Sequence, residues 1–274
     1  MHPFDTAIHL ERVAEDTFRA HTSAAYANQI GPFGGITAAT LLNAVLQHPQ
    51  RIGIPVTLTV NFAAAVANGE FTVVARAVRT GRSTQHWVVE ASQAGAVVTT
   101  ATAVTAVRRE TWCGSCTQPP QGLPPPETIS RLDGPGAPVW FANYDMRSIY
   151  GGYPAVENLP GQPVDAREED SRSAGWLRDR PGRPLDFASL AALCDAFYPR
   201  VFVKRRAIMP ASTISLTIYF HADEALLAAQ GEQFLLGVAE GIHYRHGFFD
   251  QRAELWGAGE QLLASTHQVM FFRE

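Results

Sequence analysis

The chain has 274 residues, which suits one large domain or two of about 110 residues each. With 46% hydrophobic residues it can form a full core, while its net charge of −4 is scattered and gives no basic footprint for nucleic acid. Neither a secretory signal in the first residues nor an apolar run of the roughly 18 residues needed to span a membrane is visible, so we expect a soluble, cytoplasmic protein.

The first half is predicted to hold one buried helix followed by four strands. The segment ITAATLLNAVLQH (36–48) follows the glycine-rich GPFGG, is apolar on nearly all sides and stops before Pro49, as is typical of a buried helix. Four β-branched segments come next, and the sequence Gln-Ala-Gly between the last two predicts a hairpin turn. The four segments are 54–66, 71–81, 82–95 and 96–109.

Residues 111–184 have a different composition and hold most of the prolines. We interpret them as a connector between an N-terminal unit, 1–110, and a C-terminal unit, 185–274. Structureless loops of this length are uncommon in compact domains, so parts of the connector should be ordered. We expect VWFANYDMRSIYGG (139–152) and SAGWLRDR (173–180) to form strands or covering loops.

The three cysteines, an odd number, predict no disulfide framework. Cys113 and Cys116 form a WCGSC motif that looks like a thioredoxin-type redox site, but the proline-rich TQPPQGLPPP after it cannot form the helix such a site needs. Two cysteines alone leave zinc two ligands short, and the histidines show no metal-binding spacing, so we expect no metal. Cys194 lies in an apolar segment and is expected in the core.

The second half repeats the order of the first. The segment LDFASLAALCDAFYPRVF (185–202) is predicted to be a second helix apolar all round, followed by strands in 212–222, 232–247 and the hairpin 248–272. This helix contains Asp195, whose ionised carboxylate is costly to bury without hydrogen-bond partners. Asp195 therefore either faces solvent near the helix end or has a functional role.

The two halves align on pattern rather than identity. Asp195 falls on Asn43 at an offset of 152 (195 − 43), Thr213 falls on Pro55, and Gln268 falls on Ala103. The offset grows along the chain, which indicates longer loops in the second copy of a duplicated unit. We therefore expect an internal repeat of one helix followed by an antiparallel sheet.

A buried helix followed by an antiparallel sheet, twice, predicts an α+β fold of two units. Because each helix is apolar all round, the sheet must curl about it, and this geometry is called a hotdog. Two such units can join their sheets edge to edge, which removes two exposed edge strands. The predicted architecture is a double hotdog in which each sheet wraps a long central helix.

Short motifs in both halves resemble those of the type II (TesB-like) acyl-CoA thioesterases, whose single chain carries a double hotdog. The resemblance covers both halves and is weakest in the connector. It rests on FGG (33–35) before the first helix, GRS (81–83) at the hairpin, Asp195, STI (212–214) at a strand start, and ASTHQ (264–268) near the C-terminus.

The resemblance implies a hydrolytic water held by an Asp, a Ser or Thr, and a Gln, which fall here on Asp195, Thr213 and Gln268. It also implies an acyl-CoA substrate, as in fatty-acid and lipid metabolism, no cofactor other than the coenzyme A of that substrate, and a homo-oligomer, which we expect to be a dimer. No one of these motifs is specific alone, but all three occur in order and in matching elements.

The chemistry of these residue types agrees with the implied activity. A carboxylate can remove a proton from water as a general base, and Thr213 and Gln268 can fix the water by hydrogen bonds. The thioester oxygen gains charge and needs N–H donors, which a helix start supplies. Gly35, at such a start, is a candidate contact for the oxyanion or for coenzyme A, although the turn into the helix can also require glycine there.

The first half lacks these groups. An amide at Asn43 cannot serve as a base, and Pro55 and Ala103 cannot hold water through their side chains. The sequence therefore predicts one catalytic centre per chain.

Two other functions fit a double hotdog. The first is a non-catalytic acyl-CoA-binding protein that has kept the fold. The second is an enoyl-CoA hydratase, a class that resembles a pattern with Asp and His in one segment, whereas no His accompanies Asp195. A serine-hydrolase thioesterase is not expected, because the Gly-x-Ser-x-Gly elbow is absent.

Overall fold

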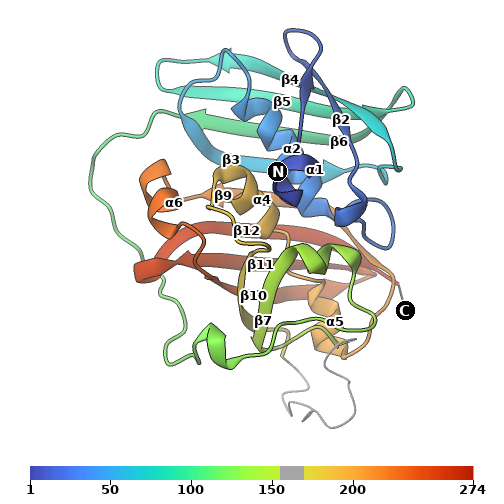
Figure 1. The fold of residues 1–274 in the computed structure, drawn as a ribbon, viewed down its shortest axis with the longest axis vertical. Coiled ribbons are helices and arrows are strands. Elements are labelled where there is room, and N and C mark those ends of the chain that lie inside the picture. The colour runs from blue at the N-terminus through green and yellow to red at the C-terminus, as the bar shows by residue number, and fades with distance from the viewer. Residues whose placement is uncertain (155–169, 274) are drawn as a thin grey trace.

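A computed structural model describes residues 1–154 and 170–273 of the chain. The strands of these residues form one antiparallel sheet in the order β1-β2-β4-β5-β6-β3-β9-β12-β11-β10-β8-β7 (Figure 1). The strands are β1 Glu11–Arg12, β2 Thr17–His21, β3 Ile54–Phe62, β4 Glu70–Thr80, β5 Thr84–Gln93, β6 Ala96–Ala106, β7 Tyr144–Tyr150, β8 Ser173–Asp179, β9 Ala211–Phe220, β10 Leu235–Arg245, β11 Phe248–Gly257 and β12 Gln261–Phe272.

The helices of the described residues are fewer than the strands, and only α2 is longer than two turns. They are α1 Pro3–Ala7, α2 Gly34–Leu46, α4 Phe187–Leu193, α5 Arg200–Arg205 and α6 Glu224–Gln230, with 3-10 turns η1 Ala24–Tyr26, η2 Pro126–Thr128, η3 Val139–Asn143 and η4 Ala258–Glu260. Both α2 and α4 lie on one face of the sheet and contact each other (Figure 1). The sheet curves around this helix pair, so the fold is the predicted α+β double hotdog.

The two halves of the sheet meet where β3 pairs with β9. Strands of the first half occupy one side of this junction and the other strands occupy the opposite side, which Figure 1 shows as the change from the blue to green strands β1–β6 to the orange and red strands β9–β12. Edge-to-edge joining of the two units is therefore confirmed. At this junction each half gives its edge strand a partner, so neither edge is left open to pair with another chain.

Helix α2 forms where the sequence predicted the first buried helix. Ten of its 13 residues are buried, which fits a helix that is apolar on nearly all sides. It begins at Gly34, directly after Phe33, and its last turn ends before Pro49. The hairpin turn at Ala94 and Gly95 is also confirmed, with φ values of 51° and 80° that suit a two-residue turn between antiparallel strands.

The prediction of one continuous helix over 185–202 is wrong. Helix α4 is only seven residues long and ends at Leu193, and helix α5 begins at Arg200. Pro199 explains the interruption, because in a helix it would lack the N–H and its ring would clash with the carbonyl of residue 195. Asp195 consequently lies in the turn directly after α4, where its N–H donates to the carbonyl of Ala192.

The two connector segments singled out from the sequence form strands. Strands β7 and β8 pair with each other, and β8 pairs with β10, so both extend the sheet of the second half. The 3-10 turn η3 precedes β7 and carries the buried Trp140 and Phe141. The connector thereby brings aromatic side chains to the helix side of the sheet.

The internal repeat is visible in the irregularities of the sheet. The pairing of β3 with β6 skips Val56, and the pairing of β9 with β12 skips Ile214. In the same way, the pairing of β5 with β6 skips Val98, and that of β11 with β12 skips Leu263. These two pairs of bulges lie at equivalent positions of the two halves, so the predicted repeat is confirmed at the level of register.

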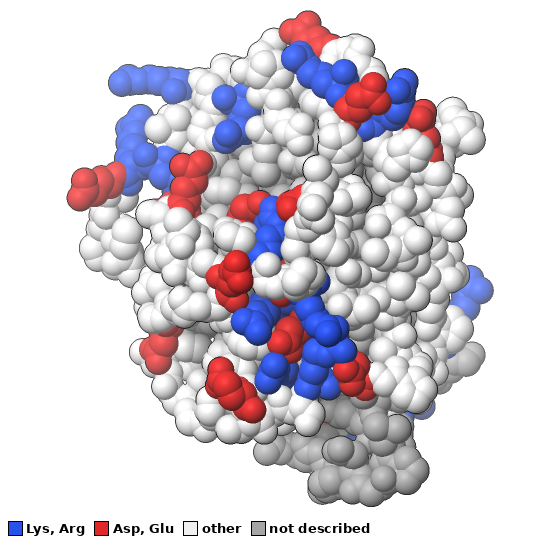
Figure 2. Space-filling model, in the orientation of Figure 1, with Lys and Arg blue, Asp and Glu red and all other residues white. Residues whose placement is uncertain are grey.

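The surface in the orientation of Figure 2 shows basic and acidic side chains next to one another, surrounded by uncharged surface. Ion pairs such as Arg147–Asp145 and Arg183–Asp186 occur among the described residues. Among the described residues, no helix is both long and apolar enough to cross a membrane.

Candidate active site

Asp195 and Gln268 are in direct contact. The Nε2 of Gln268 donates a hydrogen bond to Oδ1 of Asp195 at 2.8 Å. Asp195 is 9% exposed and Gln268 is 1% exposed, so this bond lies almost entirely away from solvent. Two of the three residues expected to hold the hydrolytic water are thus neighbours, although 73 positions separate them in the chain.

The position of Gln268 follows from the alternation of side chains along β12. His267 has 53% of its side chain exposed and contacts Asp250 across the outer face, while Gln268 points to the helices. Successive residues of a strand face opposite sides, which is the orientation predicted for this pair. Gln268 lies behind the carboxylate and acts on it directly.

The start of α2 approaches the carboxylate from the other side. The backbone N–H of Gly35 donates a hydrogen bond to Asp195. A Cβ at Gly34 would lie 2.6 Å from Oδ2 of Asp195, and a Cβ at Gly35 would lie 2.5 Å from the carbonyl oxygen of Ala192. Both glycines therefore allow α2 to lie close to the end of α4, and Gly34 was not singled out from the sequence.

Burial raises the pKa of the Asp195 carboxyl from 3.8 to about 7, while the hydrogen bonds from Gln268 and Gly35 oppose this rise. The burial effect is larger because the carboxyl is removed from solvent and meets no cation among the described residues that contact it. A carboxyl with a pKa near neutrality is available both as an acceptor and as a donor of a proton.

Thr213 lines the same cavity as Asp195. This cavity has a volume of about 400 Å³ and is lined by residues from both halves and from the connector, Gly34, Thr37, Trp140, Phe141, Tyr153 and Phe202 among them. No histidine is among its lining residues in the part of the chain that the structure describes. The third predicted residue therefore faces the space in which a substrate can meet the carboxylate.

A β-bulge turns Thr213 towards this cavity. Leu216 is fully buried, so strict alternation along β9 would direct Thr213 outward. Because the pairing with β12 skips Ile214, Thr213 instead lies opposite Met270, which is buried. Directly opposed residues of two strands share a face of the sheet, and bulges often redirect a side chain next to a functional site.

Aromatic side chains form one wall of the cavity. Phe33, the residue before α2, stacks on Trp140 with the ring centres 4.0 Å apart and the planes 8° apart. Phe141 contacts Tyr153 edge to face, and Tyr153 contacts Phe202 in the same way. This wall is apolar, whereas the carboxylate and Thr213 provide the polar groups, an arrangement typical of pockets for small molecules.

The equivalent positions of the first half carry no such group. Asn43 lies within α2, whereas Asp195 follows α4. The Nδ2 of Asn43 donates to the backbone carbonyl of Ile8 at 2.9 Å. Ala103 lies opposite Trp87, as Gln268 lies opposite Gln251. Trp87 is 1% exposed and occupies the interior of the first half with an indole ring.

None of the three cysteines is among the described residues that line the cavity. Cys113 and Cys116 are exposed and free, and Cys194 is buried in the core as predicted. Within the described ranges, no group of three or more His, Cys, Asp or Glu side chains could hold a metal ion.

Two solved structures resemble the chain along nearly all of its length. A conserved protein of unknown function with a hot dog fold from Alicyclobacillus acidocaldarius is 43% identical, covers 100% of this chain and 99% of its own, and has a TM-score of 0.92. An acyl-CoA thioesterase II from Mycobacterium marinum is 18% identical, covers 98% of each chain and has a TM-score of 0.77, which shows likeness of fold alone. Comparison with curated proteins gives no match.

Family models match both halves of the chain. The model of the acyl-CoA thioesterase N-terminal domain matches residues 23–106, and that of the acyl-CoA thioesterase C-terminal domain matches residues 120–272. The second range includes the turn of Asp195 and strands β9 and β12. Together the two matches cover most of the sequence, and the chain belongs to the acyl-CoA thioesterase family.

Proposed function

We propose that the protein hydrolyses an acyl-CoA thioester to a free acid and coenzyme A, with Asp195 as the general base. The observation that carries this proposal is the buried Asp195 carboxylate, held by Gln268 on one side and open on the other to the cavity that Thr213 lines. Membership of the acyl-CoA thioesterase family supports the substrate class.

In the proposed reaction, a water molecule lies between the Asp195 carboxylate and the thioester carbon. Asp195 takes a proton from this water while the water oxygen bonds to the carbon, and the tetrahedral intermediate then breaks its carbon–sulfur bond to expel the thiolate. The thiolate takes the proton back from Asp195 and leaves as free coenzyme A, which restores the carboxylate. Thr213 positions the water through its hydroxyl, and Gln268 does so through the carboxylate that it holds. A base with a pKa of about 7 suits this transfer, so hydrolysis should increase as pH rises through 7.

The charge on the thioester oxygen requires N–H donors, and the start of α2 is the proposed source of them. Gly35 is proposed as the contact to this oxygen or to coenzyme A, and its N–H is then shared with the Asp195 carboxylate to which it is bonded. Gly34 leaves the space for the reacting groups to come close, since a side chain there would occupy the position next to Oδ2.

Two alternatives predict different results in the same assay. An acyl-CoA-binding protein would bind acyl-CoA without releasing thiol. The presence of a carboxylate and a hydroxyl, from Asp195 and Thr213, in the cavity lining favours hydrolysis over binding alone. A hydratase of the kind considered above would use a histidine with its aspartate, and the cavity contains none among its described lining residues.

The experiment is a thiol-release assay with acyl-CoA substrates of increasing chain length, on the wild-type protein and on Asp195→Asn. We expect release with at least one acyl length and a loss of about 10²- to 10⁴-fold in kcat in the variant, the range that a general base contributes. Full activity in Asp195→Asn would contradict the role of Asp195. Measurable binding of acyl-CoA with no thiol release at any length would favour the binding protein.

A further inference from the structure

A second buried glutamine stands behind the first. Gln251 on β11 lies directly opposite Gln268 on β12 and is 2% exposed. Its Nε2 donates to Oε1 of Gln268 at 3.1 Å and to the backbone carbonyl of Phe197 at 3.2 Å. Its Oε1 accepts from the backbone N–H of Arg200 at 2.9 Å. All the polar atoms of this side chain therefore have partners in the core.

Backbone groups fix which atom donates and which accepts in each hydrogen bond of the series from Arg200 through Gln251 and Gln268 to Asp195. An amide side chain can be turned end for end, but the N–H of Arg200 can only donate and the carbonyl of Phe197 can only accept. Gln251 must therefore present its NH₂ group to Gln268, and Gln268 must present its own NH₂ group to Asp195. The result is a relay from Arg200 through two amides to the carboxylate.

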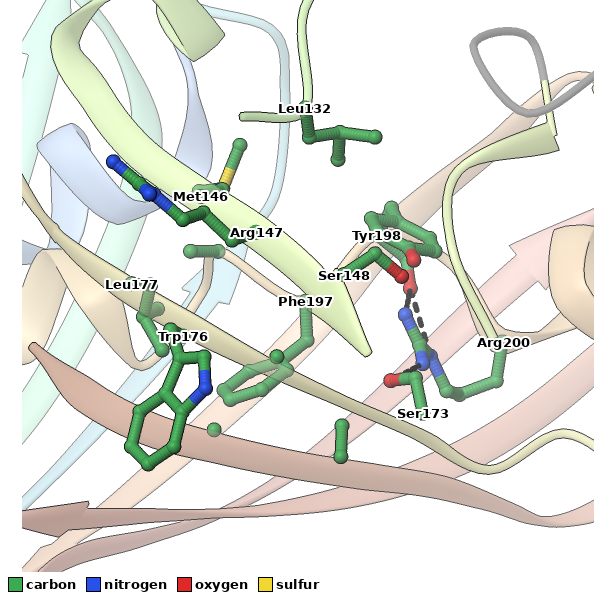
Figure 3. A pocket seen from close by; sticks show the side chains of 14 residues that line it. Leu132, Met146, Arg147, Ser148, Ser173, Trp176, Leu177, Phe197, Tyr198 and Arg200 are labelled. Carbon is green, nitrogen blue, oxygen red and sulfur yellow. Dashed lines mark hydrogen bonds between the residues drawn. The ribbon is translucent and has the colours of Figure 1, made fainter. Parts of the chain in front are cut away.

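The relay also holds the segment that carries Asp195. Phe197 and Arg200, both bonded by Gln251, belong to the non-helical stretch after α4 and to the start of α5. Figure 3 shows the other side of this stretch, where the Arg200 guanidinium is bonded to Ser173 and to the backbone carbonyl of Tyr198. Arg200 is fully buried, so its backbone N–H donates to Gln251 within the core.

The first half supports the view that the two glutamines act as a unit. The register places Trp87 and Ala103 at the positions equivalent to Gln251 and Gln268. Trp87 gives its Nε1 hydrogen to Oγ1 of Thr105 at 3.2 Å and needs no amide partner. Where the carboxylate is absent, both amides are absent too.

We infer that Gln251 is a positioning residue for the hydrolysis, fixing the amide of Gln268 and, through it, the Asp195 carboxylate. This inference rests on the proposed function for its effect on rate, but the geometry it assigns can be tested without substrate. With Gln251 in place, Oδ1 of Asp195 accepts from Gln268, and Oδ2, next to Gly34, is the oxygen that we assign to the water.

The test compares Gln251→Met with Gln230→Met. Gln230 is also 2% exposed, and its amide likewise donates to two carbonyls, of Gln233 and Phe234, and accepts from the N–H of Ala258. The control thus loses the same number of hydrogen bonds from an equally buried side chain, at a place that does not line the cavity. Gln251→Glu provides a second variant of the same shape, which lacks the two N–H donors when ionised.

We expect Gln251→Met to lower kcat about 10- to 100-fold relative to Gln230→Met, with KM changed by less than about threefold, because the carboxylate and its amide lose their fixed orientation. The midpoint of the rise of kcat with pH should move up by about one unit, since a freely turning Gln268 stabilises the ionised carboxylate less. Gln251→Glu should move it in the same direction.

The midpoint can also be measured without substrate. The ¹³C carboxyl signal of Asp195, identified by its absence in Asp195→Asn, should titrate at higher pH in Gln251→Met than in Gln230→Met. Among the described residues, Cys194 and Tyr144 interact electrostatically with Asp195, and burial raises the pKa of both well above their ordinary values, so these two groups stay neutral over this range.

The outcomes separate the two proposals. If Asp195→Asn is inactive but Gln251→Met matches Gln230→Met in kcat and in both midpoints, the relay is wrong and the proposed function stands. If Asp195→Asn keeps full activity, the proposed function is wrong, and the carboxyl titration alone decides the relay. An unchanged titration midpoint in both Gln251 variants overturns it.

Discussion

Thr59 and Thr217 face each other across the junction of the two halves, with their hydroxyl oxygens 3.1 Å apart. They are paired in register and occupy equivalent positions of the repeat, 158 residues apart. The junction between β3 and β9 is therefore the place where the two units are related most closely. Away from it the symmetry is lost, because one half places a carboxylate, a threonine and two amides where the other has a helix amide, a proline, an alanine and a tryptophan.

This asymmetry predicts that activity cannot be moved to the first half by one substitution. In the double variant Asn43→Asp with Asp195→Asn, we expect thiol release to stay as low as in Asp195→Asn alone. The new carboxylate would lie within α2, without an amide at Ala103 or a hydroxyl at Pro55 to hold water. The measurement is kcat of the single and double variants side by side, and recovery of activity in the double variant would refute a single centre per chain.

Most of the fold could be predicted from the sequence. Residues 36–48 are apolar at too many positions for a surface helix, and β-branched runs separated by turn residues define the strands of both halves. The apolar pattern of residues 185–202 does not reveal the break between α4 and α5, whereas Pro199 excludes a continuous helix there. The proline was the available signal, and it places Asp195 in a turn rather than in a helix.

The site was predictable in part. The sequence shows Asp195 as an isolated carboxylate in an apolar segment. Alternation along the predicted strand places Gln268 and His267 on opposite faces of the sheet. The sequence pattern does not show which face of β9 carries Thr213. The bulge at Ile214 changes which residues of this strand face inward, and no residue type in the sequence indicates a bulge there. Gln251 was missed because one glutamine among the polar residues of a strand gives no sign that it meets Gln268, a contact that register alone determines.

The bulge gives a direct test of Thr213. Thr213→Val removes the hydroxyl from the cavity while keeping the β-branched shape. We expect kcat to fall about 10- to 100-fold, because the hydrolytic water loses one of the hydrogen bonds that position it. Thr217→Val is the matched control on the same strand, since its hydroxyl meets Thr59 on the face away from Gln268. Thr213→Ser should keep most of the activity. Equal activity of the two valine variants would remove Thr213 from the site.

The close approach of α2 predicts that a side chain at Gly34 displaces the Asp195 carboxylate. In Gly34→Ala the new Cβ would stand 2.6 Å from Oδ2 of Asp195 and 3.3 Å from the ring of Phe62, so the carboxylate must move. We expect a loss of activity of about 100-fold, because a displacement of this size disturbs the reacting geometry. Gly81→Ala, in an exposed turn between β4 and β5 where the nearest atom is 3.2 Å away, serves as control. Comparable kcat values in the two variants would contradict the close fit.

The burial of Asp195 also predicts a conflict between function and stability. The folded protein holds the pKa of this carboxyl at about 7, above the ordinary value of 3.8 that applies to the unfolded chain. The carboxyl therefore stabilises the fold fully below about pH 4, and this contribution falls as pH rises and is lost above about 7. An asparagine at this position does not ionise, so Asp195→Asn should gain stability over the wild type as pH increases.

Urea unfolding of both proteins at pH 5 and pH 8 measures this gain. The difference in free energy of unfolding, variant minus wild type, should be more positive at pH 8 by roughly 2–3 kcal/mol, the amount that a pKa raised by a few pH units implies over this interval. Asp179, whose pKa burial raises to about 6, titrates in both proteins and cancels in the difference. Any constant cost of fitting the amide against Gly35 cancels as well. A difference that is the same at both pH values would show that Asp195 is ionised throughout, and the carboxyl would then be a weaker base than its burial indicates.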